Sequence, residues 1–256
     1  MKKTLLAVAQ ASSLTSFGAV AADKAPESSY ELSGNVSLVS DYRFRGASQS
    51  DKKPAVQAGL DLSFKNGAYL GTWTSTVSQW ANPSGEAEVD FYGGYKREFL
   101  GLGWDFGAIQ YWYPHNVATG TAAKNNTFEY YVGAAYGPVS YKISRAAGNW
   151  FGVNASGATY QDLTVTHSFS EKLSVGAHIG RQSIYTTGAD AGADYDFSDY
   201  KLSASYAVAD GYTAGIAWQW MKFQKDTTKA NWFTTTYDNG IKLYDSGLTV
   251  SITKTF

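Results

Sequence analysis

Two groups of charged side chains are spaced so that their charges would lie together. Asp41, Arg43 and Arg45 occupy every second position, and so do Glu86, Glu88 and Asp90. In an extended strand, residues two apart point to the same side. A mainly basic group facing an acidic one across a narrow space creates a field that can orient and filter small polar solutes. The alternative is that these charges pair and only fill or rigidify that space.

Three histidines are the candidates for acid–base catalysis. His115 lies in a long connection beside Asn116, His167 and Ser168 are adjacent along one expected strand and face opposite sides, and His178 falls on a polar face. His115 could act as a base, but no serine nucleophile and no acidic partner is marked by its spacing. With no cysteine, a structural zinc site is not indicated. We therefore expect no catalytic residues, no metal and no cofactor.

The composition excludes several classes of protein. Of the 256 residues, 16% are aromatic and 17% are charged, with 26 glycines, 5 prolines and no cysteine. A disordered chain and a disulfide-stapled scaffold do not have this composition. No apolar run reaches the roughly 18 residues of a membrane helix. The net charge of −1 leaves no basic footprint for nucleic acid.

The first residues are expected to be a targeting segment. Lys2 and Lys3 precede an apolar and small-residue run, and Ala19-Val20-Ala21 has the small-x-small pattern of a cleavage site. We predict a cleaved secretory signal over 1–21, a short periplasmic segment over 22–30 and one domain over 31–256.

Apolar and polar residues alternate along most of that domain. In 31–45 the even positions are mainly apolar and the odd ones mainly polar, and 55–65 has the same pattern before the tight turn Asn66-Gly67. The next strand begins at once, with Tyr69, Gly71, Trp73 and Val77 expected on the apolar face. Further strands are expected near 86–98, 102–113, 127–136, 139–147, 159–169, 173–184, 199–208, 212–223 and 246–256.

The connections between these strands alternate between short and long. Short connections are expected at 66–67, 99–101, 137–138, 170–172 and 209–211, and long ones at 46–54, 80–85, 114–126, 148–158, 185–198 and 224–245. This alternation is typical of an up-and-down antiparallel transmembrane β-barrel. We predict an all-β barrel of about 12 strands in the outer membrane, with both termini periplasmic. The stretch 224–245 could hold a strand extension or a folded loop.

Aromatic residues gather at both ends of the apolar face, as expected for two interfacial girdles. A soluble β-sandwich has the same period but no reason for this arrangement. The periplasmic girdle is expected to hold Phe64, Tyr69, Tyr95, Trp104, Tyr136, Tyr141, Phe169, Tyr212 and Phe256, and the outer one Phe44, Phe91, Trp112, Phe128, Tyr200, Trp218 and Trp220.

Other polar positions are assigned by the same alternation. The lumen is expected to be lined also by Glu129, Lys142, Lys201, His178 and Gln219, and narrowed by Tyr111, Tyr113, Tyr131, Met221 and Phe223. Arg145, Arg181 and Lys222 fall instead on the apolar face near the outer ends of their strands. There they could contact lipopolysaccharide phosphates, or simply extend to water.

The last strand, which ends at Phe256, resembles the signal by which outer-membrane barrels are recognised by the barrel assembly machinery. Lys254 departs from it, because an apolar or aromatic residue is usual there. The segment from Asp41 to Ser50, followed by Pro54, Ala55 and Gln57, is similar to the TorF-type porins of proteobacteria, and the segments 88–95 and 136–140 extend the likeness. The resemblance covers most of the mature chain. It implies an outer-membrane barrel with a pore role and no particular substrate.

We therefore expect an outer-membrane porin or narrow channel for the passive diffusion of small polar solutes or ions. Its partners would be outer-membrane lipids, lipopolysaccharide, the assembly machinery and the solute, and not nucleic acid. A twelve-stranded barrel is intermediate between side-chain-filled barrels and wide porins, which favours a narrow pore. The alternatives are a plugged structural or adhesive barrel and a barrel hydrolase.

Overall fold

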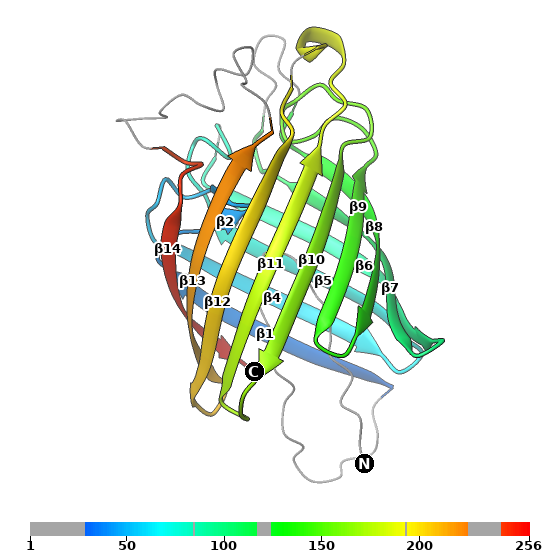
Figure 1. Ribbon diagram of the computed structural model, residues 1–256, viewed down its shortest axis with the longest axis vertical. Coiled ribbons are helices and arrows are strands. Elements are labelled where there is room, and N and C mark those ends of the chain that lie inside the picture. The colour runs from blue at the N-terminus through cyan, green and yellow to red at the C-terminus, as the bar shows by residue number, and fades with distance from the viewer. Residues whose placement is uncertain (1–28, 84, 117–123, 193, 225–241) are drawn as a thin grey trace.

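The computed structural model describes residues 29–83, 85–116, 124–192, 194–224 and 242–256. Twelve long strands form one closed antiparallel barrel (Figure 1). The predicted signal peptide and most of the 224–245 stretch lie outside the described residues. The barrel strands are β1 (Tyr30–Val39), β4 (Ala55–Phe64), β5 (Ala68–Thr76), β6 (Ala87–Phe99), β7 (Leu102–Trp112), β8 (Thr127–Tyr136), β9 (Val139–Ala146), β10 (Thr159–Ser168), β11 (Leu173–Ser183), β12 (Phe197–Ala209), β13 (Tyr212–Phe223) and β14 (Gly247–Thr255).

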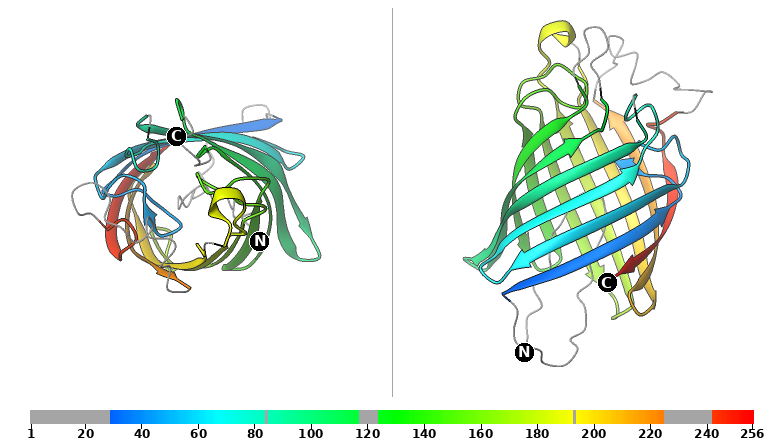
Figure 2. Two further views of the ribbon diagram at one scale, coloured as in Figure 1. Left: turned by 90° about the horizontal axis from the view of Figure 1, so that it is seen from above. Right: turned by 180° about the vertical axis from the view of Figure 1, so that it is seen from behind.

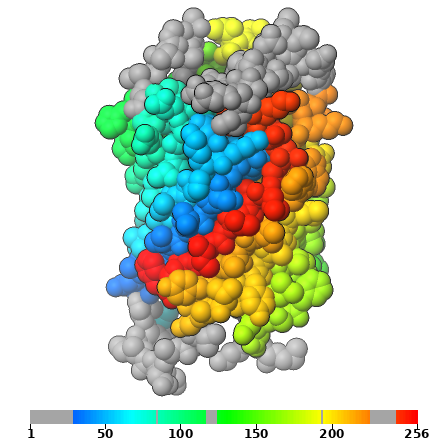
Figure 3. All heavy atoms as spheres, turned by 90° about the vertical axis from the view of Figure 1, so that its left-hand side faces the viewer, coloured from blue at the N-terminus to red at the C-terminus, as the bar shows by residue number. Residues whose placement is uncertain are grey.

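Each strand pairs with its sequence neighbours, and β1 closes the barrel by pairing with β14. At this seam Asn35 lies opposite Thr255 and Val39 opposite Ser251. Figure 3 shows the first strand beside the last one along the seam. Closure leaves no strand edge unpaired, which is the condition for a sheet that crosses a lipid bilayer. In the described part of the chain, no helix is long and apolar enough to span a membrane.

The two faces of the barrel differ as the sequence alternation predicts. Leu32, Val56, Leu60, Leu202 and Val250 project outward and are about half exposed or more. The inward positions of β1, β13 and β14 are mainly small and polar, and the hydroxyl groups of Ser37 and Thr253 bond across the seam at 2.8 Å. An apolar outside around a polar inside is the arrangement that lipid requires.

The predicted orientation of β5 is wrong. Leu62 lies directly opposite Leu70, so these two side chains share the outward face, and Leu70 is 58% exposed. Tyr69 and Trp73 therefore point into the barrel, where both are buried. The error arises because large rings pack on the inner wall of this barrel as well as on its lipid face.

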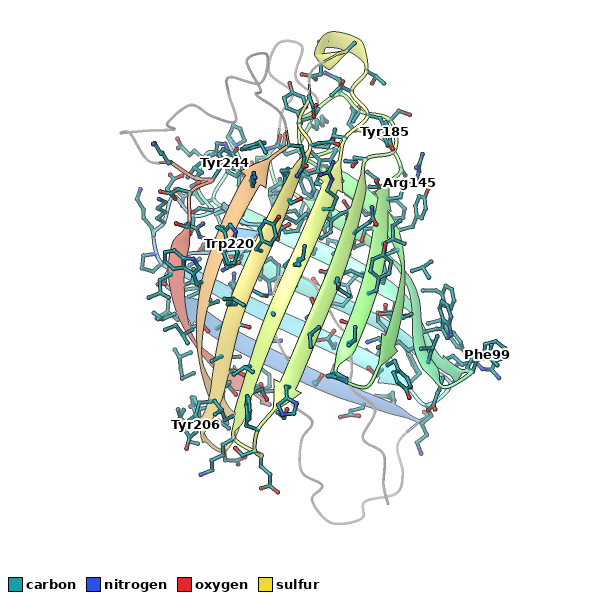
Figure 4. The ribbon with its side chains drawn as sticks, in the orientation of Figure 1. Phe99, Arg145, Tyr185, Tyr206, Trp220 and Tyr244 are labelled. Atoms are coloured by element: carbon teal, nitrogen blue, oxygen red, sulfur yellow. The ribbon has the colours of Figure 1, made fainter. Side chains whose placement is uncertain are left out.

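The other outward aromatics gather near the two ends of the wall. The ring centroids of Phe91 and Trp112, on neighbouring strands, lie 6.3 Å apart. The rings of Tyr200 and Trp220 are stacked, with centroids 5.1 Å apart. In Figure 4, Trp220 lies nearer the end with the long connections, whereas Phe99 and Tyr206 lie at the opposite end. Rings prefer the interface between hydrocarbon and water, so the two groups mark the membrane boundaries.

Short turns lie at one end of the barrel and long connections at the other, as predicted. The turns comprise 65–67, 100–101, 137–138, 169–172 and 210–211. The described ends of β1 and β14 that lead to the termini lie at the end with the short turns (Figure 1). Two more short strands, β2 (Arg43–Phe44) and β3 (Ala47–Ser48), form a separate hairpin within the first long connection. Seen from above, this segment lies inside the ring of strands (Figure 2).

Candidate functional site

The first long connection turns into the lumen instead of extending the first strand. The barrel strand ends at Val39, not at Arg45 as predicted, and the chain folds back at Arg45-Gly46. Both turn residues have positive φ, 47° and 86°, as in the type I′ turns that close two-residue hairpins. Tyr42 and Phe44 were expected on the lipid face, but they pack inside on Trp73 and Tyr111. An aromatic ring can be buried either in lipid or among other rings inside the barrel. The alternation of apolar and polar residues does not distinguish these two environments.

Arg43 holds this inward hairpin together. Its side chain is 1% exposed and its Nε donates to Asp41 at 2.7 Å. It also donates to the carbonyl oxygens of Gly46, at 3.2 Å, and Asp245, at 2.7 Å. Ser48 completes the arrangement by donating to Asp41 at 2.6 Å. Asp41 and Arg43 therefore neutralise each other and tie the hairpin to the segment before β14.

Arg45 at the hairpin tip reaches the far wall of the barrel. Its two terminal nitrogens donate to Glu129 of β8 at 3.0 and 2.6 Å, and Nη1 also donates to Gln182 of β11 at 2.8 Å. The guanidinium lies 4.1 Å from the ring centroid of Tyr160. Burial is the largest single effect and lowers the pKa of Arg45, but the charge and hydrogen bond of Glu129, together with the nearby Tyr111 and Tyr160, outweigh it, so the net pKa lies above its ordinary value. Arg45 is thus a permanently charged bridge across the lumen.

A second hairpin, at residues 150–153, meets the first one. Trp150 and Val153 pair, and the turn residues Phe151 and Gly152 have φ values of 41° and 84°. The ring of Phe151 packs edge-on against Phe44 at 5.3 Å and against Tyr111 at 5.0 Å. The inward hairpin and this second hairpin together narrow the lumen near the end with the long connections. We call this level the constriction.

The acidic group divides into buried and exposed members. Glu88 and Asp90 on β6 are each 1% exposed, and the Tyr42 hydroxyl donates to Glu88 at 3.1 Å. Glu86 lies just before β6 with an exposed side chain and does not join them. Burial, followed by the charges of Glu88 and Asp90, raises the pKa of Tyr113, which lies beside this pair. Arg43 and Arg45 take other carboxylates as partners, so the two predicted charge groups do not pair with each other.

A further polar network lies on the opposite wall. His178 lies between Asp162, at 3.2 Å, and Asp199, at 2.9 Å, and Tyr160 donates its hydroxyl to Asp199 at 2.8 Å. Sequence reasoning placed His178 in the lumen but overlooked Tyr160, Asp162 and Asp199. Their even or odd positions in the predicted strands 159–169 and 199–208 were the available signal.

The other residues assigned to the lumen face inward by their place in the strand alternation. Tyr111, Tyr113 and Gln219 are buried, and Lys142 points toward the ring of Tyr131 at 5.1 Å. Lys201 lies opposite His178 and Gln219 on the neighbouring strands. Met221 and Phe223 pack on the buried cluster that includes Trp150 and Val153 of the second hairpin.

The described residues assemble no nucleophile and no metal site. The Thr164 hydroxyl lies 3.2 Å from His178, but it donates its proton to Asp162 at 2.8 Å and is not activated. His167 faces outward onto Phe169, and His115 is exposed. No group of three or more His, Asp or Glu in the described ranges is arranged to hold a metal ion.

The three outward basic residues lie near the ends of their strands that lead to the long connections. Arg145 and Lys222 are exposed, and Arg181 contacts Asp196 at 3.5 Å. Arg181 and Lys222 both lie opposite Ser198, one on each side, so they belong to one row across three strands. Figure 4 shows Arg145 toward the same end of the barrel wall.

A family model described as "Bacterial protein of unknown function (Gcw_chp)" matches residues 23–256. The chain belongs to this family. The match supports the resemblance to a bacterial family noted above but not the finer TorF-type assignment, which stays a prediction. No curated protein matches the chain.

Solved structures of porins share the fold of this Gcw_chp chain. The NanC porin aligns with a TM-score of 0.51 at 10% identity, over 88% of this chain and 98% of that one. The KdgM porin aligns with a TM-score of 0.51 at 9% identity, over 88% and 99%. A structure of the KdgM porin in complex with disordered oligogalacturonate aligns with a TM-score of 0.50 at 8% identity. At these identities the likeness establishes the barrel fold alone.

Proposed function

We propose that this protein is an outer-membrane channel for the passive diffusion of small polar solutes or ions, narrowed by its two inward hairpins. The observation that supports this most is the closed twelve-stranded wall, apolar outside and lined inside by hydroxyl, amide and charged groups. A barrel of eight strands is filled by its own side chains, whereas a larger one leaves space along its axis. A polar inner wall then lowers the cost of moving a hydrated solute through the bilayer.

The porin fold shared with NanC and KdgM supports the same function by analogy. The TorF-type resemblance of the segment from Asp41 to Ser50 agrees with it, and in the structure this segment builds the inward hairpin. We place the short turns and both termini on the periplasmic side, because outer-membrane barrels have short periplasmic turns and longer outer loops.

The experiment that tests the channel is a liposome swelling assay with the purified barrel and neutral sugars of increasing size. A channel with this constriction is expected to admit small sugars and to exclude large ones. Swelling no faster than in protein-free liposomes would favour a plugged structural barrel, the second reading of the same lumen.

Two partners follow from the proposed location. We propose that the outward basic residues Arg145, Arg181 and Lys222 bind lipopolysaccharide phosphates, since they lie beyond the stacked rings of Tyr200 and Trp220. We also propose that the strand ending at Phe256 is read by the barrel assembly machinery. Phe256 is 70% exposed, so its ring is available for recognition.

The assembly proposal predicts a defect that is specific to the terminal ring. Phe256→Ala is expected to lower the amount of folded, heat-modifiable barrel in the outer membrane several-fold. Phe99→Ala is the matched control, because Phe99 is also outward and 60% exposed near the same end. Equal amounts of folded barrel for both variants would contradict recognition through Phe256.

A further inference from the structure

Two neighbouring carboxylates are buried at the constriction with unused hydrogen-bonding capacity. Glu88 and Asp90 lie two residues apart on β6 and share the inward face, and each is 1% exposed. Tyr42 donates to Oε1 of Glu88 at 3.1 Å and the Tyr113 hydroxyl also faces the Glu88 carboxylate, but neither Oε2 of Glu88 nor Oδ1 of Asp90 accepts a hydrogen bond of regular geometry. Buried carboxylate oxygens normally accept hydrogen bonds, so two neighbouring oxygens without a donor require an explanation.

Aromatic rings surround these carboxylates. Asp90 lies directly opposite Trp73 on one neighbouring strand and Tyr111 on the other. Tyr42 from the inward hairpin packs edge-on against Trp73 at 5.3 Å. We call Glu88, Asp90 and these three aromatic residues the acidic cluster. The indole N–H of Trp73 is also buried without an acceptor.

The acidic cluster lacks a balancing charge among the described residues. The two arginines at this level are already engaged, Arg43 by Asp41 and Arg45 by Glu129. None of the described lysines, arginines or histidines forms a salt bridge with Glu88 or Asp90. Two unpaired negative charges removed from water are strongly unfavourable. Something positive must therefore accompany the pair: a proton or a bound cation.

We infer that the acidic cluster binds a monovalent cation, either an alkali ion or the ammonium group of a small organic solute. Two carboxylate oxygens supply the charge, and the rings of Trp73, Tyr42 and Tyr111 supply the quadrupole attraction that aromatic side chains offer to cations. The absence of a third metal-ligating side chain in the described set argues against a divalent metal. This binding site is an inference beyond the proposed channel function, because the acidic cluster would bind the cation whether or not the lumen conducts.

The two unpaired carboxylates also indicate the sign of the charge on the solutes that this lumen favours. The KdgM structure named above holds oligogalacturonate, an anionic saccharide. Here the constriction retains two carboxylates after its arginines are paired, so it is expected to attract cations and repel anions. This preference rests on the proposed function, whereas binding to the acidic cluster does not.

Equilibrium binding to the full barrel, purified from membranes in detergent, tests the site separately from transport. Potassium chloride and methylammonium chloride are titrated in turn by calorimetry, each against a blank titration into the same detergent buffer without protein. We expect saturable binding of at least one of the two cations, weakened at least tenfold by Asp90→Asn or Glu88→Gln. Glu86→Gln is the matched control, since Glu86 is an exposed carboxylate two residues from Glu88, and it should bind like the unaltered protein.

A second measurement distinguishes a cation from a proton. If the pair is held neutral by a proton, the infrared spectrum contains the carbonyl band of a buried carboxylic acid. That band would disappear in the Asp90→Asn, Glu88→Gln double variant and would not respond to either salt. Such a band, or saturable binding of neither cation by a heat-modifiable barrel, would overturn the proposal. Binding of methylammonium alone would assign the site to ammonium groups, and binding of potassium alone would assign it to alkali ions.

Discussion

Arg45 combines a left-handed backbone with a buried charge, and each feature depends on the other. A non-glycine residue at φ 47° costs about 1–3 kcal/mol and persists only where its surroundings hold it. The bidentate contact with Glu129 and the bond to Gln182 provide that hold. Because the pKa of Arg45 is raised, the arginine keeps its charge at every pH at which the barrel is handled. The contact can therefore be broken only at the carboxylate.

Glu129→Gln tests the contact at residue scale. The variant leaves the Arg45 charge buried without its partner, which typically costs 2–5 kcal/mol or more. We expect a loss of about 2 kcal/mol or more in the free energy of unfolding, measured by denaturant titration of the refolded barrel in lipid. Glu171→Gln, in an exposed turn, should change it by less than about 0.5 kcal/mol. Equal free energies of unfolding for the two variants would show that the contact between Arg45 and Glu129 does not stabilise the barrel.

At the scale of elements, the barrel strands were predictable because their determinants are local. Alternation and turn residues such as Asn66-Gly67 mark the strands within one or two residues, except at the ends of the first strand and of β5. The inward hairpin was not predictable in this way. Its residues continue the alternation of the first strand through Tyr42 and Phe44, and only the turn Arg45-Gly46 carried a signal. Whether a ring faces lipid or packs in the lumen depends on strands distant in sequence.

Gly46→Ala tests the seating of the inward hairpin. A Cβ at Gly46 would lie 3.0 Å from Cβ of Asp199 and 3.2 Å from Cβ of Met221, at a φ of 86°. We expect the hairpin to leave the wall and the conductance of the barrel to rise, while heat-modifiable migration in gels is unchanged. Gly101→Ala is the control, because Gly101 also has a positive φ but has nothing within 4 Å of its Cβ position. Unchanged conductance in Gly46→Ala would contradict a constriction built by this hairpin.

We expect the whole molecule to be oriented in the membrane by its two aromatic groups and by the basic residues beyond one of them. Arg181 and Lys222 share a row, and Arg145 lies toward the same end. Charges on the lipid face are tolerated only near headgroups, so this end is expected to meet the phosphate layer of the outer leaflet.

Reversal of these charges tests that orientation. The triple variant Arg145→Glu, Arg181→Glu and Lys222→Glu is expected to lose most of the lipopolysaccharide that co-purifies after extraction from native membranes. The same reversal at Lys65, Arg97 and Lys172, which are exposed at the opposite end, should leave the co-purified amount unchanged. If the variant with Arg145, Arg181 and Lys222 reversed retains its lipopolysaccharide, these side chains extend into water and do not bind the phosphates.

The central claim, a conducting barrel with its constriction at the inward hairpin, is tested most directly by single-channel recording in a planar bilayer under a salt gradient. The refolded protein is expected to give discrete conductance steps, with a reversal potential that indicates cation preference. In Arg43→Glu plus Arg45→Glu, two charges at the constriction change sign, so both the step size and the reversal potential should shift. A folded, heat-modifiable barrel that inserts into the bilayer and gives no conductance steps would contradict this claim. It would indicate a plugged structural barrel instead.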